Sequence, residues 1–164
     1  NAGIFSQPQG WLILAESKLG HGNRAYKYWK EAAPATYNEN AEHRVLEPYV
    51  YGQFVEGKDS PFAGRAHVHW LTGTASTVMV GTTEGILGLN PETKGIVIDP
   101  SIPSEWKEYT MKKTFRGKQL NVTVKNPNGS EHGVKSVTVN GEKIEGKLIL
   151  DSILKAENDI VIEL

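Results

Sequence analysis

The most constraining feature of this 164-residue sequence is a change of hydrophobic period near residue 90. Before that point, apolar residues recur every three or four positions, which is the spacing of helices. After Asn90-Pro91 the chain consists of short apolar runs between turn residues, which is typical of strands. Helices followed by strands indicate the α+β class. We therefore expect a helical domain over 1–90 and a β domain over 91–164.

Four segments of the first part are predicted to be helices: residues 11–19, 23–32, 47–56 and 74–87. Gly20 and Gly88 are stop signals for the first and last, and the second ends before Pro34. In the third, Pro48 suits a helix start and Gly57 an end. The connections at 34–44 and 58–65 are expected to be long polar linkers.

The second part is predicted to contain short strands around residues 95–98, 111–116, 120–124, 134–139, 148–150 and 160–162. Gly117 separates two of them and suggests a hairpin, and Asn140-Gly141 is a strong signal for a tight turn. Turn residues at this spacing favour a β-sandwich or a jelly roll.

Composition excludes several kinds of chemistry. The chain has no cysteine, which rules out disulfides, zinc–thiolate sites and thiol nucleophiles. The net charge of -1 argues against nucleic acid as a partner. No apolar stretch approaches the roughly 20 residues that span a bilayer. The chain begins at Asn1 without a secretory leader, so we expect a cytoplasmic location and a piece of a longer protein.

Thr72 and Gly73 lie where a helix is expected to begin. A helix N-terminus carries unpaired N–H groups and a partial positive charge, and glycine lets a ligand approach the backbone. The pair therefore suits an anion such as phosphate. The alternative, favoured by local sequence alone, is that Thr72 or Thr74 simply caps the helix.

Two other groups of residues are candidates for binding. His67 and His69 would face the same side of a strand, but two ligands are too few for a metal site, and we expect none. The segment 47–54 combines aromatic and polar side chains, a mixture found in sugar sites and also on an ordinary core helix. The sequence indicates no two carboxylates that would form the catalytic pair of a glycosidase.

Several stretches, in this order along the chain, resemble glycoside hydrolase family 94, which comprises the cellobiose, cellodextrin and chitobiose phosphorylases. They are Asn1-Ala2-Gly3-Ile4-Phe5 leading to Gly10-Trp11, Glu47-Pro48-Tyr49-Val50-Tyr51-Gly52-Gln53, Trp70-Leu71-Thr72-Gly73-Thr74-Ala75, Ile86-Leu87-Gly88, Asp99-Pro100-Ser101-Ile102-Pro103-Ser104-Glu105-Trp106 and Phe115-Arg116-Gly117. Each stretch is a weak signal, whereas the ordered set covers nearly the whole chain.

The resemblance implies the last helices of an (α/α)6 barrel followed by a C-terminal jelly-roll-like domain. It also implies reversible, inverting phosphorolysis of a β-linked disaccharide such as cellobiose to α-glucose 1-phosphate and an acceptor sugar. No cofactor is expected, because inorganic phosphate is the co-substrate. The family's general acid is an Asp that would lie upstream of Asn1, so the chain alone is expected to be inactive. The rest of the same enzyme is then its partner, and family members are often homodimers.

Residue by residue, the resemblance assigns phosphate contacts to Thr72 and Gly73 and a donor-sugar contact to Gln53. Gln7 stands where the family usually has a phosphate-binding His, and an amide donates hydrogen bonds but supplies no positive charge. This departure, with His67-Val68-His69, resembles the cellobionic acid phosphorylase subgroup. The competing hypotheses are a carbohydrate-binding module and a β domain that only buttresses the barrel.

Overall fold

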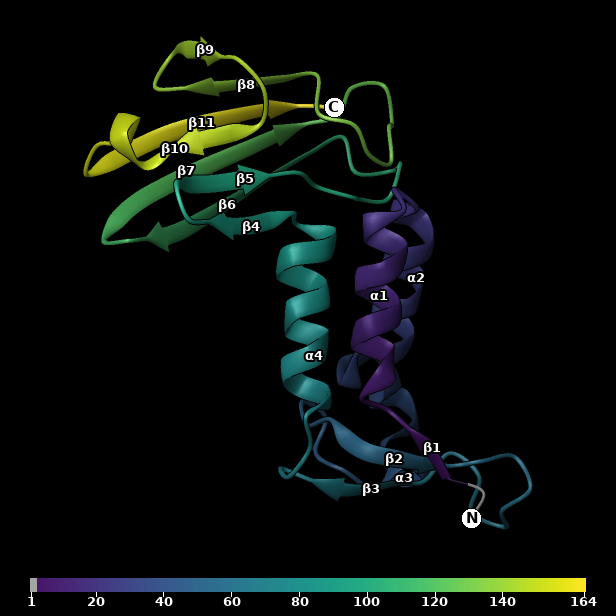
Figure 1. Ribbon diagram of the computed structural model, residues 1–164. Helices are drawn as coiled ribbons and strands as arrows, with labels where there is room; N and C mark the ends of the chain where they lie inside the picture. Colours follow the sequence, from purple (N-terminus) through teal and green to yellow (C-terminus); the bar gives the residue numbers. More distant parts are fainter. Residues whose placement is uncertain (1–2) are drawn as a thin grey trace.

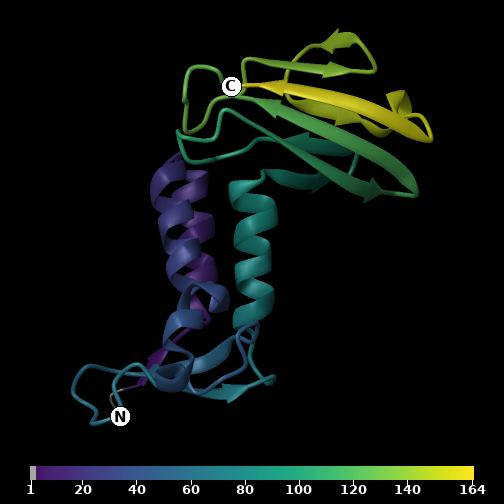
Figure 2. The same cartoon turned by 180° about the vertical axis from the view of Figure 1, so that it is seen from behind.

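The computed structural model describes residues 3–164 and has the expected α+β class. A group of helices stands between a small sheet at the N-terminal end and a larger β part that contains the C-terminus (Figure 1). Seen from behind, the same three layers are stacked along one axis (Figure 2). The helices are α1 (Pro8–Lys18), α2 (Gly22–Ala32), α3 (Ala41–Arg44) and α4 (Thr74–Val80).

The three predicted helices at 11–19, 23–32 and 74–87 are confirmed. Pro8 opens α1, and Gly20, with a φ of 79°, follows its end. After α4 the helix continues for one π turn, Gly81–Ile86. Glycine makes the α1–α4 contact possible, because a Cβ on Gly10 would lie 2.2 Å from the carbonyl carbon of Thr77. The two helices therefore approach each other backbone to backbone.

The helix predicted over 47–56 is wrong. The segment turns after Pro48 and then forms strand β2 (Gly52–Glu56), which pairs with β1 (Gly3–Phe5) and β3 (Ala66–His69) in an antiparallel sheet, order β1-β2-β3. Aromatic side chains explain the pairing, since Phe54 lies opposite both Phe5 and His67. Tertiary pairing with distant strands thus overrides the local helix signals.

The expected linker at 34–44 is also more ordered than predicted. It contains a 3-10 segment, Pro34–Asn40, followed directly by the short helix α3. Pro34 fits the first turn, where its missing N–H costs nothing. The connection at 58–65 has turns and no helix or strand, as predicted.

The β part contains two sheets. One has the order β10-β5-β4, with β4 (Leu89–Glu92), β5 (Gly95–Ile98) and β10 (Leu148–Leu150). The other has the order β6-β7-β11-β8-β9, with β6 (Glu108–Phe115), β7 (Lys118–Lys125), β8 (Ser136–Val139), β9 (Glu142–Ile144) and β11 (Glu157–Glu163). The predicted hairpin at Gly117 is confirmed as the antiparallel pair β6–β7, and β7 and β11 are parallel. Asn140 and Gly141 both have positive φ and form the predicted tight turn between β8 and β9.

Both sheets contribute to one apolar core. Alternate residues of β7 and β11 point inward and are at most 1% exposed: Leu120, Val122, Val124, Ile160 and Ile162. Ile96, Ile98 and Ile149 from the other sheet belong to the same cluster and are fully buried. Burial of this much branched apolar surface is the main source of stability in this part.

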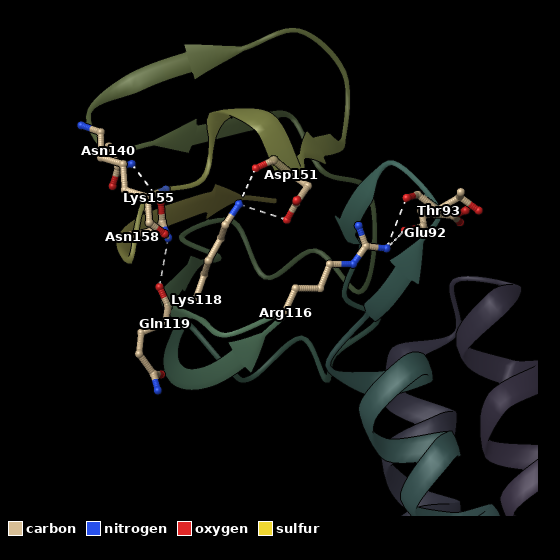
Figure 3. Close-up of polar contacts among 9 residues, drawn as sticks. All are labelled: Glu92, Thr93, Arg116, Lys118, Gln119, Asn140, Asp151, Lys155 and Asn158. Atoms are coloured by element: carbon tan, nitrogen blue, oxygen red, sulfur yellow. Dashed lines mark hydrogen bonds and ion pairs between the residues drawn. The ribbon is translucent and has the colours of Figure 1, made fainter.

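Polar side chains fasten the turns of the β part (Figure 3). Arg116 donates to the carbonyl oxygens of Glu92 and Thr93, which ties the β6–β7 turn to the β4–β5 turn. Lys118 donates to Asp151, and the buried Asn158 donates to the carbonyls of Gln119 and Lys155. These contacts give the Phe115-Arg116-Gly117 stretch a structural role.

The helices contact the β part through the turn between α1 and α2. A Cβ on Gly22 would lie 2.1 Å from the carbonyl oxygen of Ile102, so the two backbones touch. The next residue, Asn23, accepts a hydrogen bond from the backbone N–H of Ser104 at 2.9 Å and donates its own backbone N–H to Glu131. Trp106 packs edge-on against Tyr26 of α2, with 5.0 Å between ring centroids. The stretch 99–106 therefore forms the joint between the two parts.

Candidate phosphate and sugar site

The N-termini of α1 and α4 lie at the same end of the helical part, beside the sheet β1-β2-β3 (Figure 1). Gly73 is the residue before α4, and its carbonyl accepts the N–H of Thr77 as the first helical bond. The oxygen of Thr72 accepts the N–H of Thr74 at 3.1 Å and contacts the Thr74 hydroxyl at 2.8 Å. The N-cap residue of α4 is Gly73, and the hydroxyl of Thr72, the residue before it, accepts the first N–H of the helix.

Gln7 lies directly against Gly73. A Cβ placed on Gly73 would be 2.9 Å from Nε2 and 3.0 Å from Cδ of the Gln7 side chain. The Thr77 hydroxyl donates to the carbonyl oxygen of Gln7 at 3.0 Å and fixes the start of α1 on α4. Two of the residues predicted from distant stretches are therefore neighbours in space, and a side chain at position 73 would displace the Gln7 amide from its present place.

Gln53 joins the same region through its backbone. Its carbonyl accepts the N–H of Ser6 at 2.9 Å, one residue before Gln7. On the other side of Gln53, the carbonyl of Gly52 accepts the Thr74 hydroxyl at 3.3 Å. All four predicted site residues therefore belong to one connected region, where the two helix ends meet strand β2.

The two histidines on β3 have different surroundings. His67 is stacked on Phe54, with 4.9 Å between ring centroids, and its Nε2 lies 2.6 Å from a carboxylate oxygen of Glu56. His69 lies opposite Gly52. Within residues 3–164 no group of three or more His, Cys, Asp or Glu side chains is arranged to hold a metal ion.

Sequence reasoning missed the role of Trp70. Its indole N–H donates to a carboxylate oxygen of Glu47 at 3.2 Å, and its ring meets the Tyr49 ring edge-on at 6.2 Å. Hydrogen bonds from its own backbone N–H and from the Trp70 indole lower the pKa of Glu47, which therefore stays ionised at neutral pH. The sequence feature that could have pointed to Trp70 is its position directly before Leu71-Thr72-Gly73.

A cavity of about 640 Å³ adjoins this region between the small sheet and the end of α2. Its lining includes Ser6, Gly52 and Thr74, which are the immediate neighbours of Gln7, Gln53 and Gly73. Tyr37, His43 and Arg44 also line it. Gln7, Gln53, Thr72 and Gly73 are not among its lining residues.

Helices whose N-termini bring Thr-Gly and Gln together, joined to a separate β part, fit the class of glycoside-processing enzymes that the sequence resembles. Residues 1–88 match the family model of the glycosyl hydrolase 94 superfamily, catalytic domain. Residues 89–145 match the model of the glycosyl hydrolase family 65, C-terminal domain. The chain belongs to the glycosyl hydrolase 94 superfamily. Asn1 and Ala2, which open the first matching stretch, lie outside the described residues.

Curated relatives include several phosphorylases. The chain is 40% identical over 148 residues to an N,N'-diacetylchitobiose phosphorylase of Vibrio proteolyticus, covering 90% of this chain and 18% of the relative. It is 33% identical over 134 residues to a solabiose phosphorylase of Paenibacillus borealis, covering 82% and 17%. It is 30% identical over 149 residues to a cellobionic acid phosphorylase of Neurospora crassa, covering 88% and 18%. The chain thus spans less than a fifth of the length of these relatives.

Proposed function

We propose that this chain is part of an inverting disaccharide phosphorylase and supplies its phosphate site. The observation that carries the proposal is the contact of the Gln7 amide with Gly73 beside Thr72, at the meeting point of two helix N-termini. N–H groups and the partial positive charge of helix ends favour an anion there. The names of the relatives, phosphorylases acting on different glycosides, support the same reaction class.

The chemistry needs few protein groups. One carboxylic acid protonates the leaving oxygen of the glycosidic bond, while phosphate attacks the anomeric carbon from the opposite face. Phosphate takes the place of an activated water, so a second carboxylate base is unnecessary. The part of this chain is to hold the phosphate in line with the anomeric carbon. The general acid is assigned to an Asp upstream of Asn1.

The phosphate contacts are proposed for three residues. The backbone N–H of Gly73 and the hydroxyl of Thr72 donate to phosphate oxygens, and the latter exchanges its contact with the Thr74 hydroxyl for the ligand. The Gln7 amide donates from the side of α1. Gln53 is proposed to contact the donor sugar. The absence of a positive charge at Gln7 is expected to make phosphate binding depend on the helix ends.

The wider architecture is part of the same proposal. Residues 1–90 would be the last helices of an (α/α)6 barrel, and 91–164 a C-terminal jelly-roll-like domain. The partner would be the remainder of the same enzyme. Trp11 on α1 and Met79 on α4 support this, because these apolar side chains are 61% and 66% exposed. None of the helices in the described part of the chain has the length and apolarity to cross a bilayer.

The proposal extends to the sugar that the enzyme uses. The substrate is a β-linked disaccharide, and the acceptor is a sugar or sugar acid. Cellobionic acid is the candidate that the Gln7 departure suggests, and its phosphorylase is among the relatives. The higher identity to an N,N'-diacetylchitobiose phosphorylase makes an N-acetylated disaccharide the second candidate. Both should be offered to the enzyme, with cellobiose as a third.

A role in carbohydrate binding or in support alone is the alternative for the β part. A supporting role fits better. Arg116 and Lys118 bind turns within the β part, and residues 99–106 bind the helices. The outward residues of β6 and β7 are mostly Thr, Lys, Asn and Gln and lack aromatic platforms. We therefore assign the β part a buttressing role.

Thr72→Ala in the full-length protein tests the phosphate site. Loss of one donor to phosphate is expected to cost about 1–3 kcal/mol, which is a fall of about 5- to 150-fold in kcat/KM for phosphate. Initial rates at varied phosphate and fixed saturating disaccharide measure it. Thr83→Ala is the matched control, because Thr83 lies on the same helical segment and donates only to the carbonyl of Met79.

An unchanged phosphate dependence in Thr72→Ala would remove Thr72 from the site. The isolated 164-residue chain is expected to release no sugar phosphate from any of the three disaccharides. Turnover by the isolated chain above the level of its Thr72→Ala variant would contradict the assignment of the general acid to another part of the enzyme.

A further inference from the structure

Trp70 is held in an unusual backbone conformation at the end of β3. Its φ is 66°, a left-handed value that is costly for a bulky residue. The side chain is nevertheless 65% exposed, so little burial within the described residues offsets the strain. Strained residues persist where the surrounding structure needs one orientation, which is common at ligand-binding sites.

The orientation of the Trp70 ring is fixed by two neighbours. The indole N–H donates to Glu47, and the Tyr49 ring, itself 70% exposed, meets the indole edge-on. The two rings and the carboxylate therefore form one surface element, here called the Trp70 wall (Glu47, Tyr49 and Trp70). An aromatic face next to an ionised carboxylate suits a pyranose ring, whose C–H groups pack on the rings while its hydroxyls donate to the carboxylate.

The Trp70 wall adjoins the proposed phosphate site through the backbone. Trp70 is two residues before Thr72, a separation of at most about 7 Å between their Cα atoms. The pairing of His69 with Gly52 brings the segment that carries Glu47 and Tyr49 alongside the same loop. The wall and the phosphate contacts therefore belong to one end of the sheet.

The geometry of inverting phosphorolysis decides which sugar can reach this wall. Phosphate and the leaving oxygen lie on opposite sides of the anomeric carbon. The donor ring therefore lies between phosphate and acceptor, and a side chain next to the phosphate contacts the donor ring before it can reach the acceptor. The position of Trp70 beside Thr72 selects the donor side.

We propose that the Trp70 wall binds the donor sugar ring, with Trp70 and Tyr49 contacting its face and Glu47 accepting hydrogen bonds from its hydroxyls. This inference rests on the proposed phosphorylase function. It adds three residues to the donor subsite beyond Gln53. It also gives Glu47 two tasks, because one carboxylate oxygen holds the indole while the carboxylate also receives the sugar.

The test is Trp70→Ala in the full-length protein, with both substrates varied in both directions. We expect KM for the disaccharide and for the α-sugar 1-phosphate to rise at least about tenfold. KM for phosphate and for the acceptor should stay within about twofold. Phe62→Ala is the control, because Phe62 is an aromatic residue that is 56% exposed on the neighbouring loop outside the wall. It should leave all four constants unchanged.

Two conservative variants keep the test decisive if Trp70→Ala fails to fold. Trp70→Phe retains an aromatic face and loses the indole N–H, and Glu47→Gln retains an oxygen that accepts that N–H and loses the negative charge. Both should raise the disaccharide KM by a smaller factor than Trp70→Ala and leave the phosphate KM unchanged. Circular dichroism of each purified variant establishes that it is folded.

The outcomes separate the two proposals. A full-length protein that cleaves none of the disaccharides in a phosphate-dependent way overturns the proposed function and this inference with it. A phosphate-dependent enzyme whose folded Trp70 variants keep the disaccharide KM, or change the acceptor or phosphate KM instead, overturns only the assignment of the Trp70 wall to the donor ring.

Discussion

The two parts of the molecule differ in how they dispose of apolar surface. Of the 22 buried hydrophobic residues within 3–164, fifteen lie from residue 89 onward, where two sheets share one core. Of the 16 exposed large hydrophobic side chains in the described part of the chain, fourteen lie before residue 89, on the helices, the 3-10 segment and the small sheet with its loops. The β part therefore buries most of its apolar side chains within itself, whereas the helical part leaves apolar faces exposed, which is typical of a surface that binds a partner. The candidate site lies in the part with the exposed apolar side chains.

The largest effect that tests this comparison is a cavity in the β core. Ile162 on β11 is fully buried, so Ile162→Ala should lower the free energy of unfolding by about 2–5 kcal/mol. Met79→Ala on α4 should change it by less than about 0.5 kcal/mol in the isolated chain, because that side chain is 66% exposed. Urea unfolding of both variants measures the difference.

The same pair of variants sharpens the comparison in the full-length protein. If α4 packs against other barrel helices there, Met79→Ala should become destabilising while the effect of Ile162→Ala stays the same. An equally small effect of Met79→Ala in both contexts would mean that this face of α4 remains exposed, contrary to the proposed barrel.

A smaller effect is expected at the crossing of α1 and α4. Gly10→Ala would normally stabilise a helix by about 0.5–1 kcal/mol. Here the new Cβ would meet the backbone of Thr77 at 2.2 Å, so the helices must separate and the net change should be a loss of about 1–3 kcal/mol. Thermal unfolding gives the sign directly.

Gly3→Ala is the control for that crossing, since its Cβ would meet only the ring of Phe54 at 3.2 Å. Separation of the helices also moves Gln7 away from Gly73. A stabilised Gly10→Ala variant with normal phosphate kinetics would show that the backbone contact is not what sets this spacing.

Much of the fold was predictable because its signals are local. Periodicity with Gly20 and Pro34 located α1 and α2, and Asn140-Gly141 located a hairpin turn. The segment 47–56 was misassigned because its strand character comes from partners elsewhere in the chain, β1 and β3. Pro48 and Gly57 are turn residues as well as helix boundaries, and no local feature separates the two uses.

The candidate site was predictable only in part for a related reason. Thr72-Gly73 has a helix-start pattern that can be read from its neighbours. The contact of Gln7 with Gly73 depends on the glycine-mediated approach of α1 to α4, which no local pattern encodes. The Glu47–Trp70 bond likewise requires β2 to pair with β3. The Thr72 hydroxyl that accepts the Thr74 N–H is the group proposed to bind phosphate, so ligand kinetics is needed to test the second role.

The smallest expected effect concerns an ionic contact in the helical part. Glu16 on α1 lies 2.7 Å from Nδ1 of His21 and 3.3 Å from Arg24. The hydrogen bond with His21, and secondarily that with Arg24, lower the pKa of Glu16 below its ordinary value of 4.5 against the opposing effect of burial. A carboxyl group with a lowered folded-state pKa stabilises the fold above its unfolded-state pKa, and this contribution is lost as the pH falls through the folded-state value.

Glu16→Gln should therefore lower the melting temperature slightly at neutral pH and should flatten its decline below about pH 4.5. The effect is expected to be small because His21 and Arg24 are about half exposed to solvent. Glu39→Gln, on the exposed 3-10 segment, is the control and should leave the profile parallel to that of the unmodified protein. If both variants give the same profile, the contacts of Glu16 with His21 and Arg24 add nothing measurable to stability, and packing alone holds the turn between α1 and α2.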